Sequence, residues 1–515
     1  MNTKTQSGEP TRMAHPVSTS PGPASAIPGA KSALALLIGI NLFNYIDRQI
    51  LSAVLPLLQL DGTIFDPTDP WLKFKLGTLT SAFLVAYMIF SPLVGWLDGH
   101  GYRRWVILGV GVSVWSIASG CSGFATGYWM LLATRCLVGV GEGAYGPVAS
   151  AMIADAYPLA SRAKALAFFN MAIPVGSAIG FVVGGQVADY YDDWRHAFWL
   201  TFLGLGLGTY CFLKKELPRP QTAAQAENAP GYFAVLKRLT RNSSFVYCCV
   251  GMTAITFVLG GVAAWIPTYV FQRESRFVLD TQAIDSLTNP PEETKAKPLP
   301  DEVIAKLRAI ATSDEIEFGA LKGKVEGALT NNEMVLHFEP VARAATTLRS
   351  PKLGSITTIF GGIVVLGGFA ATGFATWLGE RLRPRLRGAY FWVIGGGALA
   401  ALPCFIAFVY LPLPWGWLAM FFAVVGLFMH VGPGFTILAN VVTSEMRATA
   451  FAINILVIHV LGDVISPPLI GAAADAFHWN TALIGTSAMI LVGAFFWFLG
   501  AEHLEGDTLR ASASE

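Results

Sequence analysis

Long apolar segments separated by polar loops form the main pattern of this chain. About 20 apolar residues suffice for a helix to cross the hydrocarbon core of a bilayer, and twelve segments approach or exceed that length. They lie near 33–59, 77–97, 104–124, 128–153, 164–188, 195–213, 245–271, 354–378, 388–410, 414–440, 449–474 and 481–500. The pattern predicts an all-α membrane protein with twelve transmembrane helices.

The twelve predicted helices fall into two sets of six, separated by a polar stretch. Similar loop sequences, 95–104 and 376–385, follow the second helix of each set. Such a repeat predicts two pseudo-symmetric halves with a site between them. The expected organisation is a disordered tail at 1–31, six-helix bundles at 32–213 and 245–500, a cytoplasmic linker at 214–244 and a tail at 501–515. Within the linker, 231–241 has the composition of an amphipathic surface helix.

One loop is far longer than the others. It spans 272–353, is mostly polar, and contains two segments of helical periodicity at 301–311 and 313–329. We expect a small helical cap outside the membrane. The sequence leaves open whether this cap serves gating, partner contact or neither.

Composition narrows the class of protein. Hydrophobic residues make up 53% of the chain and charged residues 13%, against about 25% charged in soluble domains. The net charge of +1 and the lack of a basic block argue against a nucleic-acid partner. The six cysteines have no metal-ligand spacing, and no phosphate-binding loop or nucleophile elbow occurs. We therefore expect neither metal nor cofactor, and not an enzyme.

The loop charges predict an orientation. Lys and Arg gather in the loops on one side of the predicted bundle, whereas the short loops opposite are mainly acidic. Because positively charged loops stay in the cytoplasm, both termini are expected there. We expect a monomer in the cell (inner) membrane of a prokaryote, surrounded by membrane lipids.

Two charges lie near the centre of the first apolar segment. Asp47 and Arg48 would each cost at least ~2.5–3.5 kcal/mol in the bilayer core, so they must face an aqueous or protein-lined interior. On a helical wheel Asn44 and Arg48 share a polar stripe, with Asp47 beside it. The segment therefore predicts an interior site.

The fourth segment carries a matching pair of charges. Arg135 and Glu142 are seven positions apart and face the same way. If the first and fourth helices face each other, two acids and two arginines meet. They could simply neutralise one another.

The alternative interpretation of this charged group is functional. A buried carboxylate binds protons more readily, and a nearby Arg opposes this, so movement between them would switch proton affinity. An Arg, which keeps its charge, suits an anionic headgroup with bidentate geometry. Glu142 is the preferred proton carrier, followed by Asp47.

A second candidate relay lies in the eleventh segment. His459 and Asp463 are four positions apart and should share a helix face. A His–Asp pair inside a membrane can relay protons, but a packing pair is equally compatible. The proton-coupling candidates are Glu142, Asp47, Asp463 and His459, and the substrate-binding candidates are Arg48, Arg135, Asn44 and Tyr45.

The repeated loops resemble the signature of the major facilitator superfamily, Gly-x-Leu-x-Asp-Arg-x-Gly-Arg-Arg. The first copy matches at Gly95, Leu97, Arg103 and Arg104, with Asp98 one position early and His100 in place of Arg. The second copy has Leu378, Glu380, Arg381 and Arg385 in register. The resemblance implies a cytoplasmic latch between helix ends. Its candidate residues are Asp98, Arg103, Arg104, Arg162, Glu380, Arg381, Arg385 and Arg447.

Within that superfamily the chain resembles the Spinster family of lipid transporters. The matching strings are NYIDR (44–48), AVLP (53–56), TRCLVGVGEGAYGPVAS (134–150), FNMAIPVGSAIGFVVGG (169–185) and MRATAFAINILVIHVLGDVISPPLIG (446–471). The resemblance implies movement of sphingosine-1-phosphate or lysophospholipids, coupled to protons in several members. It assigns Asp47, Arg48, Arg135 and Glu142 to the proton and substrate pathway.

The sequence therefore favours a secondary transporter that moves an anionic lysolipid or sphingolipid by alternating access with protons. The alternative within this class is a proton-coupled symporter of a soluble organic anion such as a sugar acid. From a different class, a receptor or sensor using the loop at 272–353 stays open.

Overall fold

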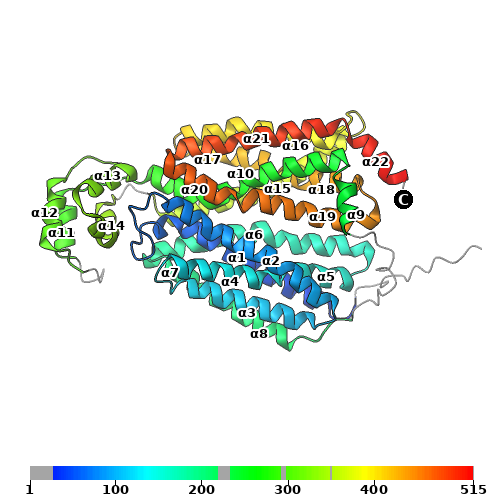
Figure 1. Cartoon of the computed structure of the whole chain (residues 1–515), viewed down its shortest axis with the longest axis horizontal. Helices are drawn as coiled ribbons and strands as arrows, with labels where there is room; N and C mark the ends of the chain where they lie inside the picture. Colours follow the sequence, from blue (N-terminus) through cyan, green and yellow to red (C-terminus); the bar gives the residue numbers. More distant parts are fainter. Residues whose placement is uncertain (1–26, 219–231, 291–296, 348–350, 514–515) are drawn as a thin grey trace, which may run out of the picture.

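The computed structural model describes residues 27–218, 232–290, 297–347 and 351–513 (Figure 1). Nearly all ordered elements in these ranges are helices, which confirms the predicted all-α class. The only extended pairing in the described part is a pair of isolated bridges, from Phe277 to Ile316 and to Thr346. Most of the predicted tail at 1–31 and the linker residues 219–231 lie outside the described residues.

The N-terminal half is a bundle of long helices. Its elements are α1 (Ala30–Leu58), α2 (Leu72–Gly99), α3 (Arg104–Ser122), α4 (Tyr128–Gly143), α5 (Gly146–Ala156), α6 (Leu159–Tyr191), α7 (Arg195–Trp199), a 3₁₀ turn (Leu200–Leu203) and α8 (Gly204–Leu213). The helix α1 begins inside the segment expected to be a tail. It carries Lys31, Asp47 and Arg48 and packs along α6.

The C-terminal half repeats this arrangement. Its elements are α9 (Tyr232–Leu239), α10 (Ser243–Glu274), α15 (Leu353–Leu382), α16 (Ala389–Tyr410), α17 (Trp415–Phe428), α18 (Val431–Asn440), α19 (Ser444–Ile458), α20 (Ser466–Ala476), α21 (Trp479–Ala501) and α22 (Leu504–Ala513). In the described residues, eleven helices or helix pairs are long and apolar enough to span a membrane. With α1 they make the predicted twelve.

Two predictions about the flanks of this half need correction. The segment 501–515 was expected to be a tail, but α22 occupies most of it, and the Asp507 carboxylate accepts the backbone N–H of Ser244 at the start of α10. The predicted surface helix at 231–241 forms as α9, but Val235 and Leu239 are buried in the core of the C-terminal half. Tertiary contacts fix both short helices.

Four of the described spanning segments are interrupted, three of them just before a proline and one at the 3₁₀ turn Leu200–Leu203. The break between α4 and α5 precedes Pro147, which lies in the first turn of α5. The break between α17 and α18 falls at His430, just before Gly432 and Pro433. The segment His459–Asp463 is π-helical and precedes α20, whose first turn contains Pro467. Proline removes a backbone donor and interrupts the helical ladder.

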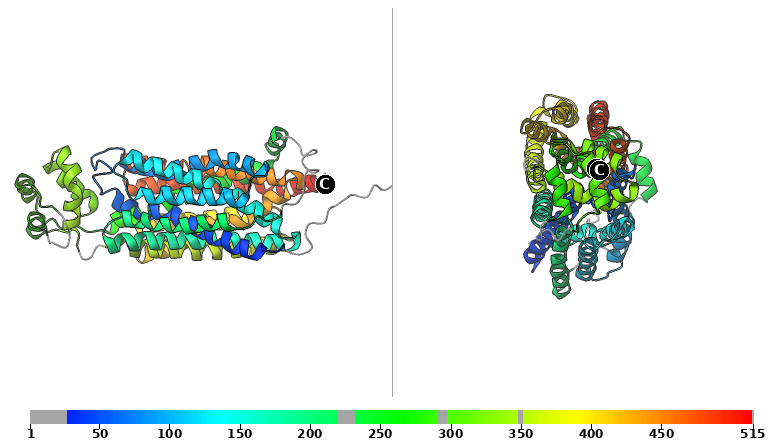
Figure 2. Two further views of the ribbon diagram at one scale, coloured as in Figure 1. Left: turned by 90° about the horizontal axis from the view of Figure 1, so that it is seen from below. Right: turned by 90° about the vertical axis from the view of Figure 1, so that its left-hand side faces the viewer.

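The insertion forms a separate lobe at one end of the bundle, which we call the insertion end (Figures 1 and 2). The described helices of the lobe are α11 (Thr281–Thr288), α12 (Asp301–Ala309), α13 (Phe318–Ala328) and α14 (Asn331–Ala345). Their apolar residues enclose a core that also takes in Leu60, from the loop after α1. Arg343 forms an ion pair with Asp192. The lobe is thus tethered to one half and docked on the other.

The two halves contact each other toward the insertion end. On α2, Lys73 pairs with Asp475 of α20 at 3.3 Å. The Gln272 side chain of α10 donates to the Gln59 side chain, which follows α1, at 2.8 Å. The helices α6 and α15 also pack together, and the rings of Phe181 and Phe360 lie 5.0 Å apart. In the described part of the chain, no ion pair joins the halves at the opposite end, where the C-terminus lies (Figure 1).

Candidate functional site

A charged pair joins α1 to α4 in the interior of the N-terminal half. The Arg48 Nε lies 2.7 Å from Glu142 Oε2. The Glu142 side chain is fully buried, whereas 20% of the Arg48 side chain stays accessible. Taking two charges out of water costs several kcal/mol per ion unless they pair and hydrogen-bond. The pair is therefore buried on its acidic side and accessible on its basic side.

Three aromatic rings surround the Arg48 guanidinium. Its Cζ lies 4.8 Å from the ring centre of Tyr45, 4.9 Å from that of Phe83 and 5.5 Å from that of Tyr87. Rings within about 6 Å attract a cation through their quadrupoles. Together with Glu142 they hold the guanidinium in place while leaving part of it accessible.

The second acid–arginine pair is linked through hydroxyl groups. On α3, Ser119 donates a short hydrogen bond to Asp47 and accepts one of 3.2 Å from Arg135. The same guanidinium donates to Ser122 at 2.6 Å and lies 5.0 Å from the Phe198 ring. Asp47 and Arg135 therefore interact through a serine rather than directly.

Four polar atoms of this group have no hydrogen-bond partner, although they are buried. They are Asp47 Oδ2, Glu142 Oε1, Asn44 Nδ2 and Arg135 Nε. An unsatisfied buried polar group costs about 1–3 kcal/mol. Such a cluster is typical of a site whose remaining positions are taken by a proton, water or ligand.

Glycines in α4 bring these side chains together. A Cβ on Gly139 would lie 2.2 Å from the Phe83 carbonyl oxygen of α2, and one on Gly141 would lie 2.6 Å from the Trp115 backbone nitrogen of α3. Only glycine allows both helices to approach so closely. These two glycines thus set the distance from α4 to the helices on either side.

The His–Asp candidate lies in the C-terminal half. His459 Nδ1 lies 2.9 Å from an oxygen of Asp463, within the π-helical segment. The two side chains are 31% and 20% accessible. The next residue, Val464, accepts a short hydrogen bond from the Ser81 hydroxyl of α2, so the pair lies beside the interface with the N-terminal half. Turns of π-helix are frequent at functional sites.

The first loop copy forms a compact ion-pair network. Arg104 donates to Asp98 at 2.7 and 3.1 Å and to Asp155 at 2.6 Å. The Arg103 and Arg162 side chains, also predicted latch residues, form no ion pair with any described residue. This network ties α2, α3 and α5 together within one half.

The second loop copy is less connected. Glu380 accepts a 2.5 Å hydrogen bond from the Tyr390 hydroxyl, and Arg381 lies over the Trp377 ring. Arg447 donates to the Ala439 carbonyl. Arg381 and Arg385 form no ion pair with any described residue. The contacts described for Glu380, Arg381 and Arg447 all stay within the C-terminal half.

Sequence reasoning missed the linking residues. It did not single out Ser119 and Ser122 of α3 or Phe83 and Tyr87 of α2, which complete the charged group. A signal for the serines was available, since serines recur every third position at 113, 116, 119 and 122. Such spacing favours one helix face.

Two similar six-helix halves, with a buried group of acids and arginines inside the N-terminal half, are typical of a membrane transporter rather than an enzyme. A family model of the Major Facilitator Superfamily matches residues 37–284. Protein spinster homolog 3 of Danio rerio is 30% identical over 503 residues, which cover 93% of this chain and 86% of that protein. Protein spinster homolog 1 of Homo sapiens is also 30% identical and covers 88% and 75%. The chain therefore belongs to the Spinster family of the major facilitator superfamily.

Solved structures support the same fold. The crystal structure of a bacterial homolog to the human lysosomal transporter Spinster, in an inward-facing and unoccupied conformation, superposes with a TM-score of 0.69 at 18% identity. The match covers 93% of this chain and 98% of that one. At this identity the likeness concerns the fold.

Proposed function

We propose that this protein is a proton-coupled secondary transporter that moves an anionic lysolipid or sphingolipid by alternating access. The observation that carries the proposal is the pair formed by Arg48 and Glu142, buried on the acidic side and accessible on the basic side. Its family membership supports a transporter. The substrate class and the coupling of transport to protons are inferred from the chemistry of this pair and from the family resemblance.

Competition for Arg48 links the substrate to the proton. A phosphate or carboxylate that binds the accessible guanidinium takes the place of Glu142, since a bidentate anion needs the same donor groups. A buried carboxylate that has lost its cation favours its protonated form. Anion binding at Arg48 and proton binding at Glu142 thus occur together, and the charge added to the interior stays near zero.

Aromatic residues around Arg48 favour an amphipathic substrate. The rings of Tyr45, Phe83 and Tyr87 lie next to the guanidinium. They offer apolar surface directly beside the anion-binding group, which suits a headgroup followed by a hydrocarbon chain. A fully hydrated sugar acid would gain less from the same surroundings.

The location of the contacts between the halves supports alternating access. In this conformation their contacts gather near the insertion end. Basic loops at the opposite end point to the cytoplasm by the positive-inside rule, so the site would open to the cytoplasm here. We propose a monomer in the cell membrane with both termini cytoplasmic.

Uptake into proteoliposomes tests the substrate class. We expect lysophospholipid or sphingosine-1-phosphate to be transported, and free headgroup analogues without acyl chains to compete weakly. Arg48→Ala should abolish transport, whereas Lys237→Ala, an exposed residue of α9, should leave it unchanged. Transport of a hexuronate alone, with strong competition by headgroup analogues, would instead identify a soluble-anion symporter.

A further inference from the structure

A cavity lies between the insertion lobe and the ends of the membrane helices. Its volume is about 790 Å³. Residues of α2, α10, α20 and α21 line it on the side of the membrane helices, and residues of α13 and α14 line it on the side of the lobe. We call it the outer vestibule. It borders the contact between the halves, since Lys73, Asp475, Gln59 and Gln272 all line it.

The outer vestibule has an excess of positive charge. Its lining includes the cations Lys73, Arg273 and Lys322 and the anions Asp475 and Glu317. Lys73 is paired with Asp475 at 3.3 Å, and Arg273 with Glu274 at 3.2 Å. Lys322 is half-buried and forms no ion pair with any described residue. A lysine that lines a cavity and has no ion-pair partner among the described residues is suited to bind an anion.

Aromatic rings form much of the remaining wall. They belong to Tyr269, Phe318, Phe338, Tyr410, Phe477 and Trp479. The Trp479 ring lies 5.4 Å from Lys73 Nζ, so an apolar surface directly adjoins a cation. The wall therefore combines two lysines with rings, as a site for an amphipathic anion requires.

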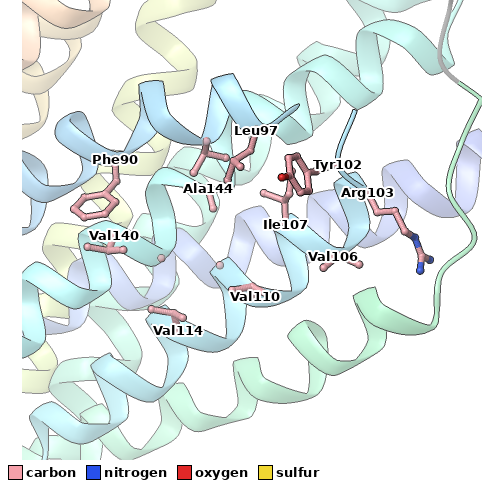
Figure 3. A pocket seen from close by; sticks show the side chains of 13 residues that line it. Phe90, Leu97, Tyr102, Arg103, Val106, Ile107, Val110, Val114, Val140 and Ala144 are labelled. Atoms are coloured by element: carbon pink, nitrogen blue, oxygen red, sulfur yellow. The ribbon is translucent and has the colours of Figure 1, made fainter. Parts of the chain in front are cut away.

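A different groove lacks such a combination of charges and rings. It is an apolar pocket of about 430 Å³ on the N-terminal half, lined by residues of α2, α3 and α4. Arg103 lies at one end of the lining residues, and its guanidinium points away from them (Figure 3). Nothing in the structure distinguishes what would fill it from ordinary bilayer lipid. The outer vestibule has a specific charge arrangement that this groove lacks.

We propose that the outer vestibule is a second binding site for an amphipathic anion. The anionic group lies between Lys73 and Lys322, and the apolar part packs against Trp479 and Phe318. This site goes beyond the proposed function, because it lies at the insertion end of the contact between the halves and does not include Arg48.

Occupancy of this site affects the contact between the halves. An anion on Lys73 competes with Asp475 for the same ammonium group. The ion pair of these two residues joins α2 to α20, so an anion that replaces Asp475 weakens a link between the halves. The site thereby couples ligand arrival from the insertion side to opening of that side.

Binding of 1-naphthyl phosphate to the full-length protein in nanodiscs tests this site. This probe combines a ring with a phosphate and stays in the aqueous phase. We expect Lys322→Ala to lower its affinity roughly tenfold, since a charge-assisted contact is lost. Asp475→Asn should raise the affinity for the probe, because the neutral amide no longer holds the Lys73 ammonium in an ion pair. Asn has nearly the same shape as Asp, so the packing should change little. Lys324→Ala, an exposed lysine of the same helix, is the matched control and should bind as the wild type does.

The variants separate this inference from the proposed function. Equal affinity in Lys322→Ala and Lys324→Ala, or no gain in Asp475→Asn, would overturn the outer site. In Arg48→Ala the outer site should persist. Binding that disappears entirely in Arg48→Ala would likewise overturn it. If transport is insensitive to Arg48→Ala while Lys322→Ala still weakens binding, the proposed function fails and the outer site stands.

Discussion

Arg48 of α1 and Glu142 of α4 form a 2.7 Å ion pair although they are 94 positions apart in the chain. Removing one partner of a buried pair leaves a buried charge uncompensated, which typically costs ~3–5 kcal/mol. Because the Glu142 carboxyl left behind can take up a proton, we expect Arg48→Met to cost at or below the low end of that range. The double variant Arg48→Met/Glu142→Gln should recover much of the loss. Thermal unfolding of the purified variants in detergent measures both, and equal losses in the single and double variants would argue against the pairing.

The hydroxyl link between Asp47 and Arg135 can be tested on one helix. Ser119→Ala removes the group that both residues share, and we expect the transport rate to fall about tenfold, as for loss of one hydrogen bond to a charge. Ser116→Ala is the matched control, because its buried hydroxyl has no hydrogen-bond partner. Uptake assays compare the two. Equal transport rates in both variants would show that Ser119 has no role in the site.

An engineered disulfide can test the contact between the halves at the insertion end. A Cβ on Gly185 of α6 would lie 3.0 Å from the Thr357 Cβ of α15, slightly less than the ~3.5–4.5 Å of a disulfide. Oxidised Gly185→Cys/Thr357→Cys should be locked in this conformation and stop transporting, with activity restored by reduction. Each single variant is the control. Full transport by the cross-linked protein would show that these helices need not separate.

The lobe offers a pH-dependent prediction. Hydrogen bonds from Lys306 and from Thr330 lower the pKa of Glu333 from 4.5 to about 2. A lowered pKa stabilises the folded state above the unfolded value, and this contribution is lost as the pH falls from about 4.5 toward 2. We expect amide exchange at the start of α14, corrected for its intrinsic pH dependence, to accelerate over that range in the intact protein. In Glu333→Gln this acceleration should be absent, and its persistence would implicate another group.

Hydropathy was sufficient to predict most of the membrane helices, because each needs a long apolar segment. Charges within such segments identified Asp47, Arg48, Arg135 and Glu142, because a buried charge is too costly to lack a partner. Which acid meets which arginine was not predictable. That depends on how deeply α4 packs between α2 and α3, which close contacts at Gly139 decide.

Features that depend on distant contacts were also missed. Helix α22 is short and polar. It is held in place by the hydrogen bond that its Asp507 accepts from Ser244 at the start of α10, rather than by its own apolar periodicity. The docking of the lobe rests on Leu60 and on the ion pair of Arg343 with Asp192. Neither residue of that pair belongs to a local motif, so only the folded chain reveals the contact.

The central claim is that Glu142 carries the proton that accompanies an anionic lipid. The most direct measurement uses proteoliposomes loaded with a pH-sensitive dye, with lysophospholipid added to wild type and to Glu142→Gln. The account predicts lipid-dependent proton flux in the wild type and none in the variant, which should still exchange lipid across the membrane because Arg48 remains. Lipid movement without any proton signal in the wild type, or an unchanged proton signal in Glu142→Gln, would contradict it.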